Sequence, residues 1–192
     1  MAEPDGACPN CGAVRHGRYC HACGQDNRRL GLQLGDAVAD AVDALTSLDS
    51  RLLRTVLGLS RRPGDMVRRY LDGQRVGFVA PFRYALATCA VWWLAVAWQL
   101  SGVDLAKVPA GLRVSLQYGQ LLNLLFVPAL ALVQRLVFLG AGRGYLPHLA
   151  FSFFVLGHVF LWRAGLSLLG FAFPQLAPVL NKADAVVFVV YT

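Results

Sequence analysis

The stretch that decides the fold is LPHLAFSFFVLGHVFLWRAGLSLLGFAF, residues 146–173. It is apolar apart from a few side chains, among them His148, His158 and Arg163. A helix needs about 20 mostly apolar residues to cross the hydrocarbon of a bilayer. This stretch exceeds that length, so we expect it to form a membrane-spanning helix.

Two earlier stretches have the same apolar character. They cover residues 84–100 and 118–138, and we expect both to span the membrane, with loops at 101–117 and 174–184. A fourth apolar segment starts at residue 185. Its eight residues would extend only about 12 Å as a helix, which is too short to cross a bilayer. Either the sequence is truncated within a partial fourth span, which we expect, or this tail folds back into the membrane interface.

The charge distribution indicates a polar head and a membrane body. Only 15 % of the 192 residues are charged, whereas about a quarter are charged in ordinary soluble domains. Residues 84–192 carry eight of the 29 charged side chains (11 acidic plus 18 basic), and residues 1–83 carry the other 21. The acidic N-terminus lacks the apolar segment of a secretory signal peptide.

The arginines predict the orientation of the chain. Those that precede the first span most closely are Arg61, Arg62, Arg68, Arg69, Arg75 and Arg83. The next loop contains only Lys107 and Arg113. Because positive residues favour the cytosolic side, we expect a multi-pass protein of the plasma (inner) membrane with a cytosolic N-terminus. The arginines expected to face membrane lipids, anionic ones included, are Arg61, Arg62, Arg68 and Arg69.

The segment before the first span, residues 28–80, predicts amphipathic helices at the membrane surface. Residues 34–59 repeat apolar side chains at helical spacing. These side chains are Val38, Val42, Leu45, Leu52 and Val56. Pro63 ends the pattern, and a short second helix follows, with Asp65 expected as its N-cap and Gly73 as its stop. An ordinary solvated helix is the alternative for this second helix.

Four cysteines near the N-terminus follow the pattern Cys8-x2-Cys11-x8-Cys20-x2-Cys23. Each Cys-x-x-Cys-Gly turn points two thiolates toward one ion, and two such turns supply the four soft ligands that zinc prefers in closed structural sites. Disulfides are one alternative, but cytosolic thiols stay reduced. A rubredoxin-like iron site is the other. We expect residues 1–27 to form a zinc ribbon with these four ligands.

The combined prediction is an all-α helical membrane protein with a small N-terminal four-cysteine zinc ribbon, divided into residues 1–27, 28–80 and 81–192. Four cysteines fill the metal site, so we expect a structural ion, with His16 and His21 outside the site. Within residues 1–27 two arginines stand against three acidic residues. Because this is no basic patch, we expect no nucleic acid and an unidentified protein partner instead.

Three polar side chains in the last span are candidates for function, because ionisable groups at membrane depth are costly. His148 and His158 are ten residues apart, about 15 Å along a helix and about 80° around it, so they cannot share one ion without other ligands. Packing between helices is the favoured interpretation of both. Arg163 either extends to the interface, which is the outcome we expect, or faces a cavity, where Asn123 or Gln120 could pair with it. No catalytic constellation is visible, so we expect no enzyme.

Several short motifs occur together in this chain. The first are CPNCG and, at residues 17–25, GRYCHACGQ. The others are Thr55, Arg62-Pro63-Gly64, Tyr70 to Arg75, Pro81 to Tyr84 and Tyr145 to Phe151. Together they resemble an uncharacterised bacterial membrane family, catalogued as domain of unknown function three-six-six-seven. The resemblance implies a cytosolic ribbon, a linker and several spans, with no established activity, and members usually continue beyond a fourth span.

Two classes of function fit these features. The leading hypothesis is an interaction or anchoring module, in which the ribbon is tethered to a helical membrane bundle. The alternative is a transporter or channel-like subunit, indicated by His148, His158 and Arg163 at membrane depth. Small residues such as Ala85 and Gly157 allow close helix packing and homo-oligomers.

Overall fold

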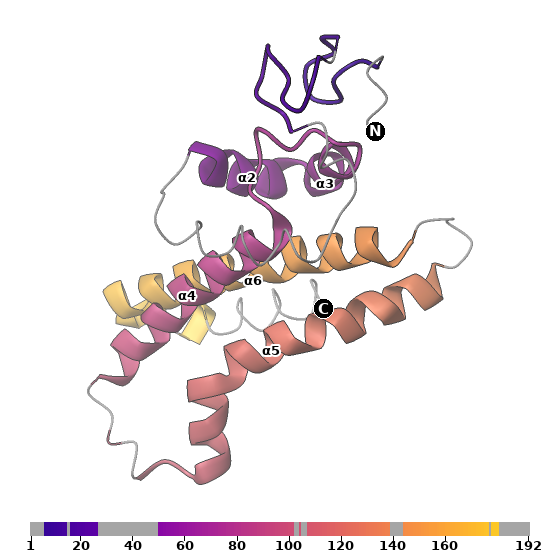
Figure 1. Cartoon of the computed structure of the whole chain (residues 1–192). Helices are drawn as coiled ribbons and strands as arrows, with labels where there is room; N and C mark the ends of the chain where they lie inside the picture. Colours follow the sequence, from indigo (N-terminus) through magenta and orange to yellow (C-terminus); the bar gives the residue numbers. More distant parts are fainter. Residues whose placement is uncertain are drawn as a thin grey trace. The chain divides into compact units, whose positions relative to one another are not determined.

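The computed structural model describes residues 6–14, 16–26, 50–101, 104, 107–138, 144–176 and 178–180 (Figure 1). Two compact units, Met1–Tyr84 and Ala85–Thr192, are described separately below. All named elements in these residues are helices, which confirms the predicted helical fold for the described part of the chain. The predictions for residues 34–49 and for the segment from residue 185 lie outside it.

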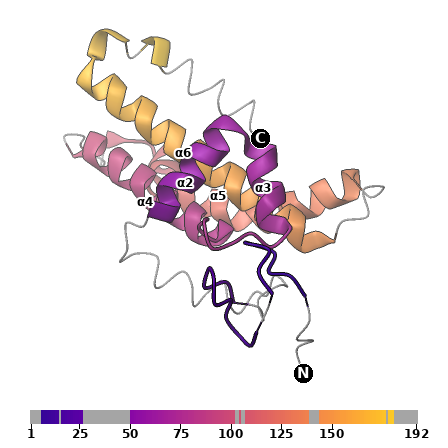
Figure 2. The ribbon, with the colours of Figure 1, turned by 90° about the horizontal axis from the view of Figure 1, so that it is seen from above.

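The first unit contains two packed helices, α2 (Ser50–Arg61) and α3 (Pro63–Leu71), which lie side by side in both views (Figures 1 and 2). The residues that they bury are Thr55, Leu59, Met66, Val67 and Tyr70. Gly58 permits their close approach, because a Cβ there would lie 2.9 Å from Met66 Cγ. Within the described residues, the helix predicted at 34–59 is present from Ser50 and ends at Arg61, two residues later than predicted.

The start of α3 differs from the prediction. Arg62 occupies the N-cap position and Pro63 the first turn, so the expectation that Asp65 caps this helix is wrong. Proline is favoured at the first helical position because its missing N–H would have no intrahelical partner there. Asp65 lies in the first turn instead and accepts a hydrogen bond from Arg69 Nη2 at 3.1 Å.

The predicted stop of α3 at Gly73 is confirmed. The Gly73 N–H donates to the Tyr70 carbonyl at 3.2 Å, and the Gln74 N–H donates to the Arg69 carbonyl at 3.0 Å. This pair of hydrogen bonds forms a Schellman motif. Gly73 has φ +101°, and a Cβ at this position would lie 3.0 Å from the Cβ of Pro9. Both the backbone conformation and the neighbouring proline therefore favour glycine here.

Replacing Gly73 with alanine is expected to destabilise the chain by about 1–2 kcal/mol, because an L-residue is strained at positive φ and its Cβ would crowd Pro9. Gly64→Ala is the matched control, since Gly64 lies in α3 and nothing stands within 4 Å of an added Cβ. Thermal unfolding in detergent should give a lower midpoint for Gly73→Ala alone. Equal midpoints for the two variants would contradict this account.

A buried hydroxyl ties α2 to the segment that leads into α4 (Pro81–Leu100). The Thr55 side chain is fully buried; its hydroxyl donates to the Arg51 carbonyl at 2.8 Å and accepts from the Val79 backbone N–H at 3.0 Å. Val79 lies two residues before the first residue of α4. Thr55 therefore fixes the chain where the first apolar helix begins.

The second unit contains most of α4, then α5 (Ala110–Val137), α6 (Tyr145–Ala172) and a short 3-10 helix, η3 (Pro174–Leu176). Each of the three predicted spans lies on one of the α-helices. Figure 1 shows α5 and α6 running in opposite directions, and the two helices pack against each other. Their core consists of Val127, Ala131 and Leu149.

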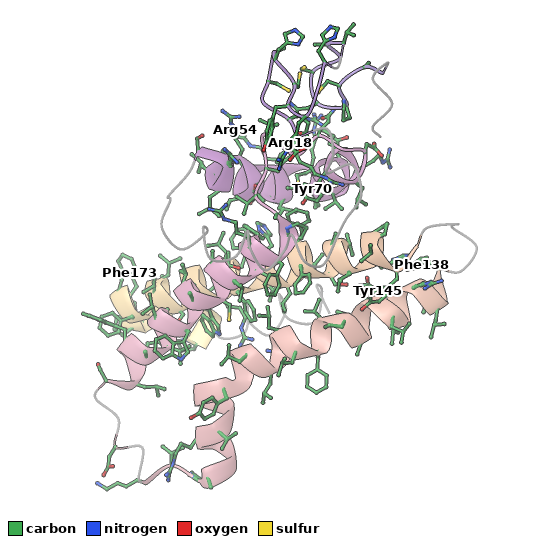
Figure 3. The ribbon with its side chains drawn as sticks, in the orientation of Figure 1. Arg18, Arg54, Tyr70, Phe138, Tyr145 and Phe173 are labelled. Atoms are coloured by element: carbon green, nitrogen blue, oxygen red, sulfur yellow. The ribbon has the colours of Figure 1, made fainter. Side chains whose placement is uncertain are left out.

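Two side-chain hydrogen bonds join α5 and α6. The Tyr145 hydroxyl donates to the carbonyl of Pro128, which lies inside α5, at 2.9 Å. The buried Ser152 hydroxyl lies 3.0 Å from the side-chain oxygen of Gln134. Tyr145 and Phe138 mark the neighbouring ends of the two helices in Figure 3. These two contacts thus pair polar groups of α5 with polar groups of α6.

The start of α5 differs from the predicted loop at 101–117, since residues 110–117 are helical. Pro109 precedes the helix, and polar residues such as Arg113 follow within its first turns. Polar side chains disfavour the hydrocarbon of a bilayer but not the helix itself, so the helix begins before the apolar stretch. Figure 1 shows this first part of α5 running at an angle to the rest.

By length and composition, α6 could cross a membrane: it has 28 residues, and half of its most apolar window is buried inside the molecule. Among the described residues, α6 is the helix that is long and apolar enough to cross a membrane. A shorter apolar segment, Leu121–Val137, lies in α5. The expected span at 146–173 therefore coincides with a helix of sufficient length. The spans at 84–100 and 118–138 coincide with helices, and their insertion into a membrane stays a prediction.

Candidate metal centre

Two turns of identical design carry the four N-terminal cysteines. In the first turn, the Cys8 N–H donates to the Ala13 carbonyl and the Gly12 N–H donates to the Cys8 carbonyl, both at 2.8 Å. The same two hydrogen bonds recur in the turn that starts at Cys20 and contains Gly24. Gly12 and Gly24 have φ values of +76° and +74°, which glycine adopts without strain. The sequence Cys-x-x-Cys-Gly therefore closes each turn locally.

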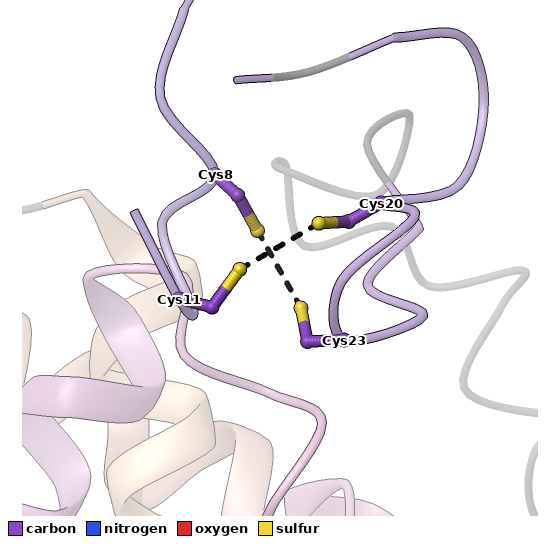
Figure 4. Close-up of side chains that lie close together, drawn as sticks. All are labelled: Cys8, Cys11, Cys20 and Cys23. Atoms are coloured by element: carbon purple, nitrogen blue, oxygen red, sulfur yellow. Dashed lines mark hydrogen bonds between the residues drawn. The ribbon is translucent and has the colours of Figure 1, made fainter. Parts of the chain in front are cut away.

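The four sulfurs converge on one point (Figure 4). The Sγ atoms of Cys8 and Cys23 are 3.7 Å apart, those of Cys11 and Cys20 are 3.6 Å apart, and all four lie within 4.8 Å of one another. Tetrahedral ligands at about 2.3 Å from an ion would be separated by about 3.8 Å. A disulfide would need about 2.05 Å, and all four cysteines are free thiols. The arrangement could therefore hold one metal ion.

The thiols of the cluster differ in acidity. Burial raises the pKa of Cys23, but hydrogen bonds from the Gln25 backbone, the Asn10 side chain and neighbouring thiols outweigh it and lower that pKa to about 7. A backbone hydrogen bond from Ala13 lowers the pKa of Cys11, but contacts with the other thiols and partial desolvation raise it to about 12. Once one thiol of the cluster has ionised, its negative charge thus disfavours ionisation of the neighbouring thiol. A cation at the centre would remove that repulsion and allow all four to ionise.

His16 and His21 are exposed and do not join the sulfurs. Their rings lie beside each other, with centroids 5.9 Å apart. The group of potential ligands found among the described residues consists of the four cysteines alone. That both histidines stay outside the metal site remains a prediction.

Comparison with known proteins bears on the segment that contains α2, α3 and the first part of α4. Residues 49–92 match a family model described as a protein of unknown function, DUF3667. This match confirms the resemblance to that family for residues 49–92, whereas the bacterial origin and the N-terminal ribbon stay predictions. It includes Thr55, Gly58 and Gly73, whose structural roles are described above, but neither the cysteine cluster nor α5 and α6. No curated protein and no solved structure matches the chain.

Four basic residues of the matched segment, residues 49–92, lie at the surface. Arg61, Arg62, Arg68 and Arg69, which the sequence predicts to face lipids, are all exposed. Arg69 makes an ion pair with Asp65, one turn earlier on α3. Both members of that pair are themselves exposed, so these four arginines are accessible to an external partner.

The two histidines of α6 occupy different environments. His158 is buried, and its Nε2 accepts a hydrogen bond from the Trp162 indole N–H at 3.0 Å, one turn along the same helix. His148 is partly buried and stacks on Phe138, with ring centroids 6.5 Å apart. Among the described residues, neither histidine lies in a group of side chains that could hold a metal ion. Both contacts agree with histidines packed between aromatic neighbours.

Arg163 contacts an aromatic ring of α4. Its guanidinium carbon lies 5.0 Å from the centroid of the Trp92 ring, a cation–π contact. Further along both helices, the Gln99 side chain donates to the carbonyl and the hydroxyl of Ser167. From the first contact to the second, the residue numbers increase in both helices, so α4 and α6 run parallel. From the sequence we expected Asn123 or Gln120 as a partner for Arg163, and the contact with Trp92 was not predicted.

We expect Arg163→Leu and Trp92→Leu each to destabilise the chain by about 1–2 kcal/mol, because each removes one partner of a desolvated cation–π contact. The double variant should lose less than the sum of the two effects. Arg163→Lys should retain much of the stability, since it keeps the cation. Thermal unfolding in lipid nanodiscs provides the measurement.

Trp93→Leu is the control for this double-variant cycle, since Trp93 is the neighbouring residue of α4 and is exposed. Its effect should be additive with that of Arg163→Leu. If the effects of Trp92→Leu and Arg163→Leu prove additive as well, the contact between these two side chains contributes no stability.

Proposed function

We propose that this chain is an integral membrane protein in which a four-cysteine zinc ribbon serves as an interaction module, anchored on a small bundle of helices. The observation that carries the proposal is the closed cysteine cluster, in which four thiols surround one point. Such a site has no open position for a substrate, so the ion would stabilise the fold of the ribbon and leave its surface for binding. No catalytic activity is part of the proposal.

Zinc is the proposed ion. Four thiolates at this spacing suit zinc, and the same ligands could hold iron as in rubredoxin. Zinc is favoured over iron because two Cys-x-x-Cys pairs are typical of structural zinc modules. The reduced thiols of a cytosolic ribbon argue against disulfides. Metal analysis of the purified full chain should give one zinc per chain and no stoichiometric iron.

The membrane part of the proposal rests on apolar surface. Leu94 and Trp98 of α4 are 60 % and 64 % exposed, and Leu125 and Phe126 of α5 are 75 % and 67 % exposed. Large apolar side chains exposed on both helices fit helices that lipid would cover. The parallel course of α4 and α6 fits a chain that crosses a bilayer, returns through α5 and crosses again.

The proposed location is the plasma (inner) membrane with the N-terminus in the cytosol, because the arginines concentrate before α4. A protein is the proposed partner of the ribbon. Arg18 pairs with Asp26 at 3.6 Å, which weakens any attraction of the ribbon for nucleic acid. Val14 and Tyr19 are more than half exposed and offer apolar contacts of the kind that protein partners use. Homo-oligomers through the bundle belong to the same proposal.

A transporter or channel-like subunit is the second candidate. The observation that favours it is the row of polar contacts between α4 and α6, in which Gln99, Ser167 and Arg163 take part. Ionisable and polar groups inside a membrane bundle often line a pathway. Ion or solute flux into vesicles that contain the purified chain would support this candidate.

The test of the interaction module compares proteins that co-purify with the full chain and with its Cys20→Ser variant, both extracted from the same membranes. Cys89→Ser is the control, because Cys89 lies in α4 away from the cluster. A partner lost only from Cys20→Ser, with membrane insertion unchanged, supports the module. An identical set of partners for all three proteins would contradict it.

A further inference from the structure

The outward face of α2 combines leucines with arginines. Leu53 is 63 % exposed and Leu57 is 41 % exposed, although the buried side of the same helix holds Thr55 and Leu59. Leu53 and Leu57 stand one helical turn apart, and the exposed Arg61 follows one turn later. Helices that lie in the plane of a membrane interface have this composition, with leucines on one face and arginines beside them.

The charge of the α2–α3 pair is strongly positive. Ser50–Asp72 contains six arginines, all of them exposed: Arg51, Arg54, Arg61, Arg62, Arg68 and Arg69. The same residues contain two aspartates, Asp65 and Asp72, which gives a net charge of +4 (six minus two). A surface of this kind complements an anionic bilayer, where each arginine adds attraction within a Debye length of the lipid phosphates.

The hydrogen bond between Thr55 and Val79 fixes this surface close to the start of α4. Pro81 follows Val79 by two residues, a step that spans at most about 7 Å. If α4 enters a bilayer at its N-terminal end, α2 is held within reach of the same interface.

We propose that the leucine and arginine face of α2, with the arginines of α3, binds an anionic phospholipid surface. Leu53 and Leu57 insert among the acyl chains below the headgroups, and the arginines contact the phosphates. The inference rests on the proposed membrane insertion of the bundle, and it adds a second, peripheral attachment through the DUF3667 segment. The chain then attaches to the membrane twice, through the α2–α3 pair and through the helical bundle. This double attachment holds the α2–α3 pair flat against the cytosolic leaflet.

The test places a photoreactive benzophenone amino acid at position 57 of the full chain, reconstituted in nanodiscs. One set of discs contains phosphatidylglycerol and the other only phosphatidylcholine. A second probe at position 125, which is 75 % exposed on α5, reports contact of the bundle with lipid. Irradiation followed by mass spectrometry measures the fraction of each probe that carries a phospholipid.

We expect a lipid adduct at position 57 in the anionic discs and at position 125 in both. Arg54→Gln with Arg61→Gln should reduce the relative occupancy of lipid at position 57 by about fivefold per arginine, the factor that corresponds to about 1 kcal/mol. The adduct at position 125 should not change. A reduction at least as large is expected when phosphatidylcholine replaces phosphatidylglycerol, because every arginine then loses its anionic partner.

Other outcomes overturn the proposal in distinguishable ways. An adduct at position 125 without one at position 57 leaves the membrane bundle intact and removes the α2 contact. Equal adducts at position 57 in both lipids exclude recognition of anionic lipid. A cross-link from position 57 to protein assigns the face to a partner or a second copy. A lack of lipid adducts at both positions contradicts the proposed membrane insertion itself.

Discussion

Replacing Cys20 with serine is expected to unfold residues 6–26 and to abolish stoichiometric metal binding. The described ribbon contains only two isolated β-bridges, and its buried hydrophobic residues are the cysteines Cys8 and Cys20 themselves. Nothing else in this segment offsets the entropy of ordering it. Structural zinc contributes about 10–16 kcal/mol to the folding of comparable small modules at neutral pH. Loss of one of four ligands should therefore remove most of the stability of the ribbon.

The measurement combines zinc content with amide NMR of a peptide of residues 1–30. The metal-bound peptide should show dispersed signals, which a chelator should collapse to the spectrum of the Cys20→Ser peptide. In the full chain, Cys89→Ser is the control and should keep one zinc. Unchanged dispersion in the metal-free peptide would show that the ribbon folds without an ion.

Replacing Thr55 with valine is expected to destabilise the chain by about 1–3 kcal/mol. Valine has nearly the same shape as threonine but no hydroxyl, so the Val79 N–H would lose its acceptor in a buried position. The start of α4 would also lose the contact that holds it to α2. Chemical unfolding of the first unit in the full chain, followed by hydrogen exchange at Val79, measures both effects.

Two substitutions serve as controls for Thr55→Val. Thr55→Ser keeps the oxygen and should retain protection of the Val79 amide. Ser60→Ala removes an exposed hydroxyl that donates to the Val56 carbonyl at 2.9 Å, so it should cost much less. If Thr55→Ser exposes the Val79 amide as much as Thr55→Val does, the hydrogen bond is not what positions this segment.

The cysteine cluster was predictable because its determinants are local in sequence. Each Cys-x-x-Cys-Gly turn closes by hydrogen bonds within six residues, and Gly12 and Gly24 supply the required positive φ. The helices were predictable for a related reason, since apolar runs and the stop at Gly73 act over a few residues. Apolar runs and stop signals indicated where α3 and α6 lie and where α2 ends, within a few residues, whereas the start of the helix predicted at 34–59 lies outside the described residues.

Contacts between residues far apart in the chain could not be predicted from the sequence. The hydrogen bond from Val79 to Thr55 joins residues 24 apart, and no local pattern marks it. Trp92 and Arg163 meet across two helices, so the sequence offered only polar candidates for Arg163. Helical periodicity showed that α2 is amphipathic, but only packing against α3 reveals that Leu53 stays outside. The early start of α5 was not predicted because the polar residues at 101–117 indicated a loop, although polar residues can also form a helix.

Cysteine accessibility on both sides of the membrane tests the central claim most directly. Single cysteines are placed at Ala2 and at Lys107, an exposed residue between α4 and α5, and labelling by a membrane-impermeant thiol reagent on intact cells is compared with the unsubstituted chain. The account predicts labelling of Lys107→Cys and none of Ala2→Cys until the membrane is permeabilised. Labelling of Ala2→Cys would place the ribbon outside the cytosol, and protection of both positions would show that α4 does not cross the membrane.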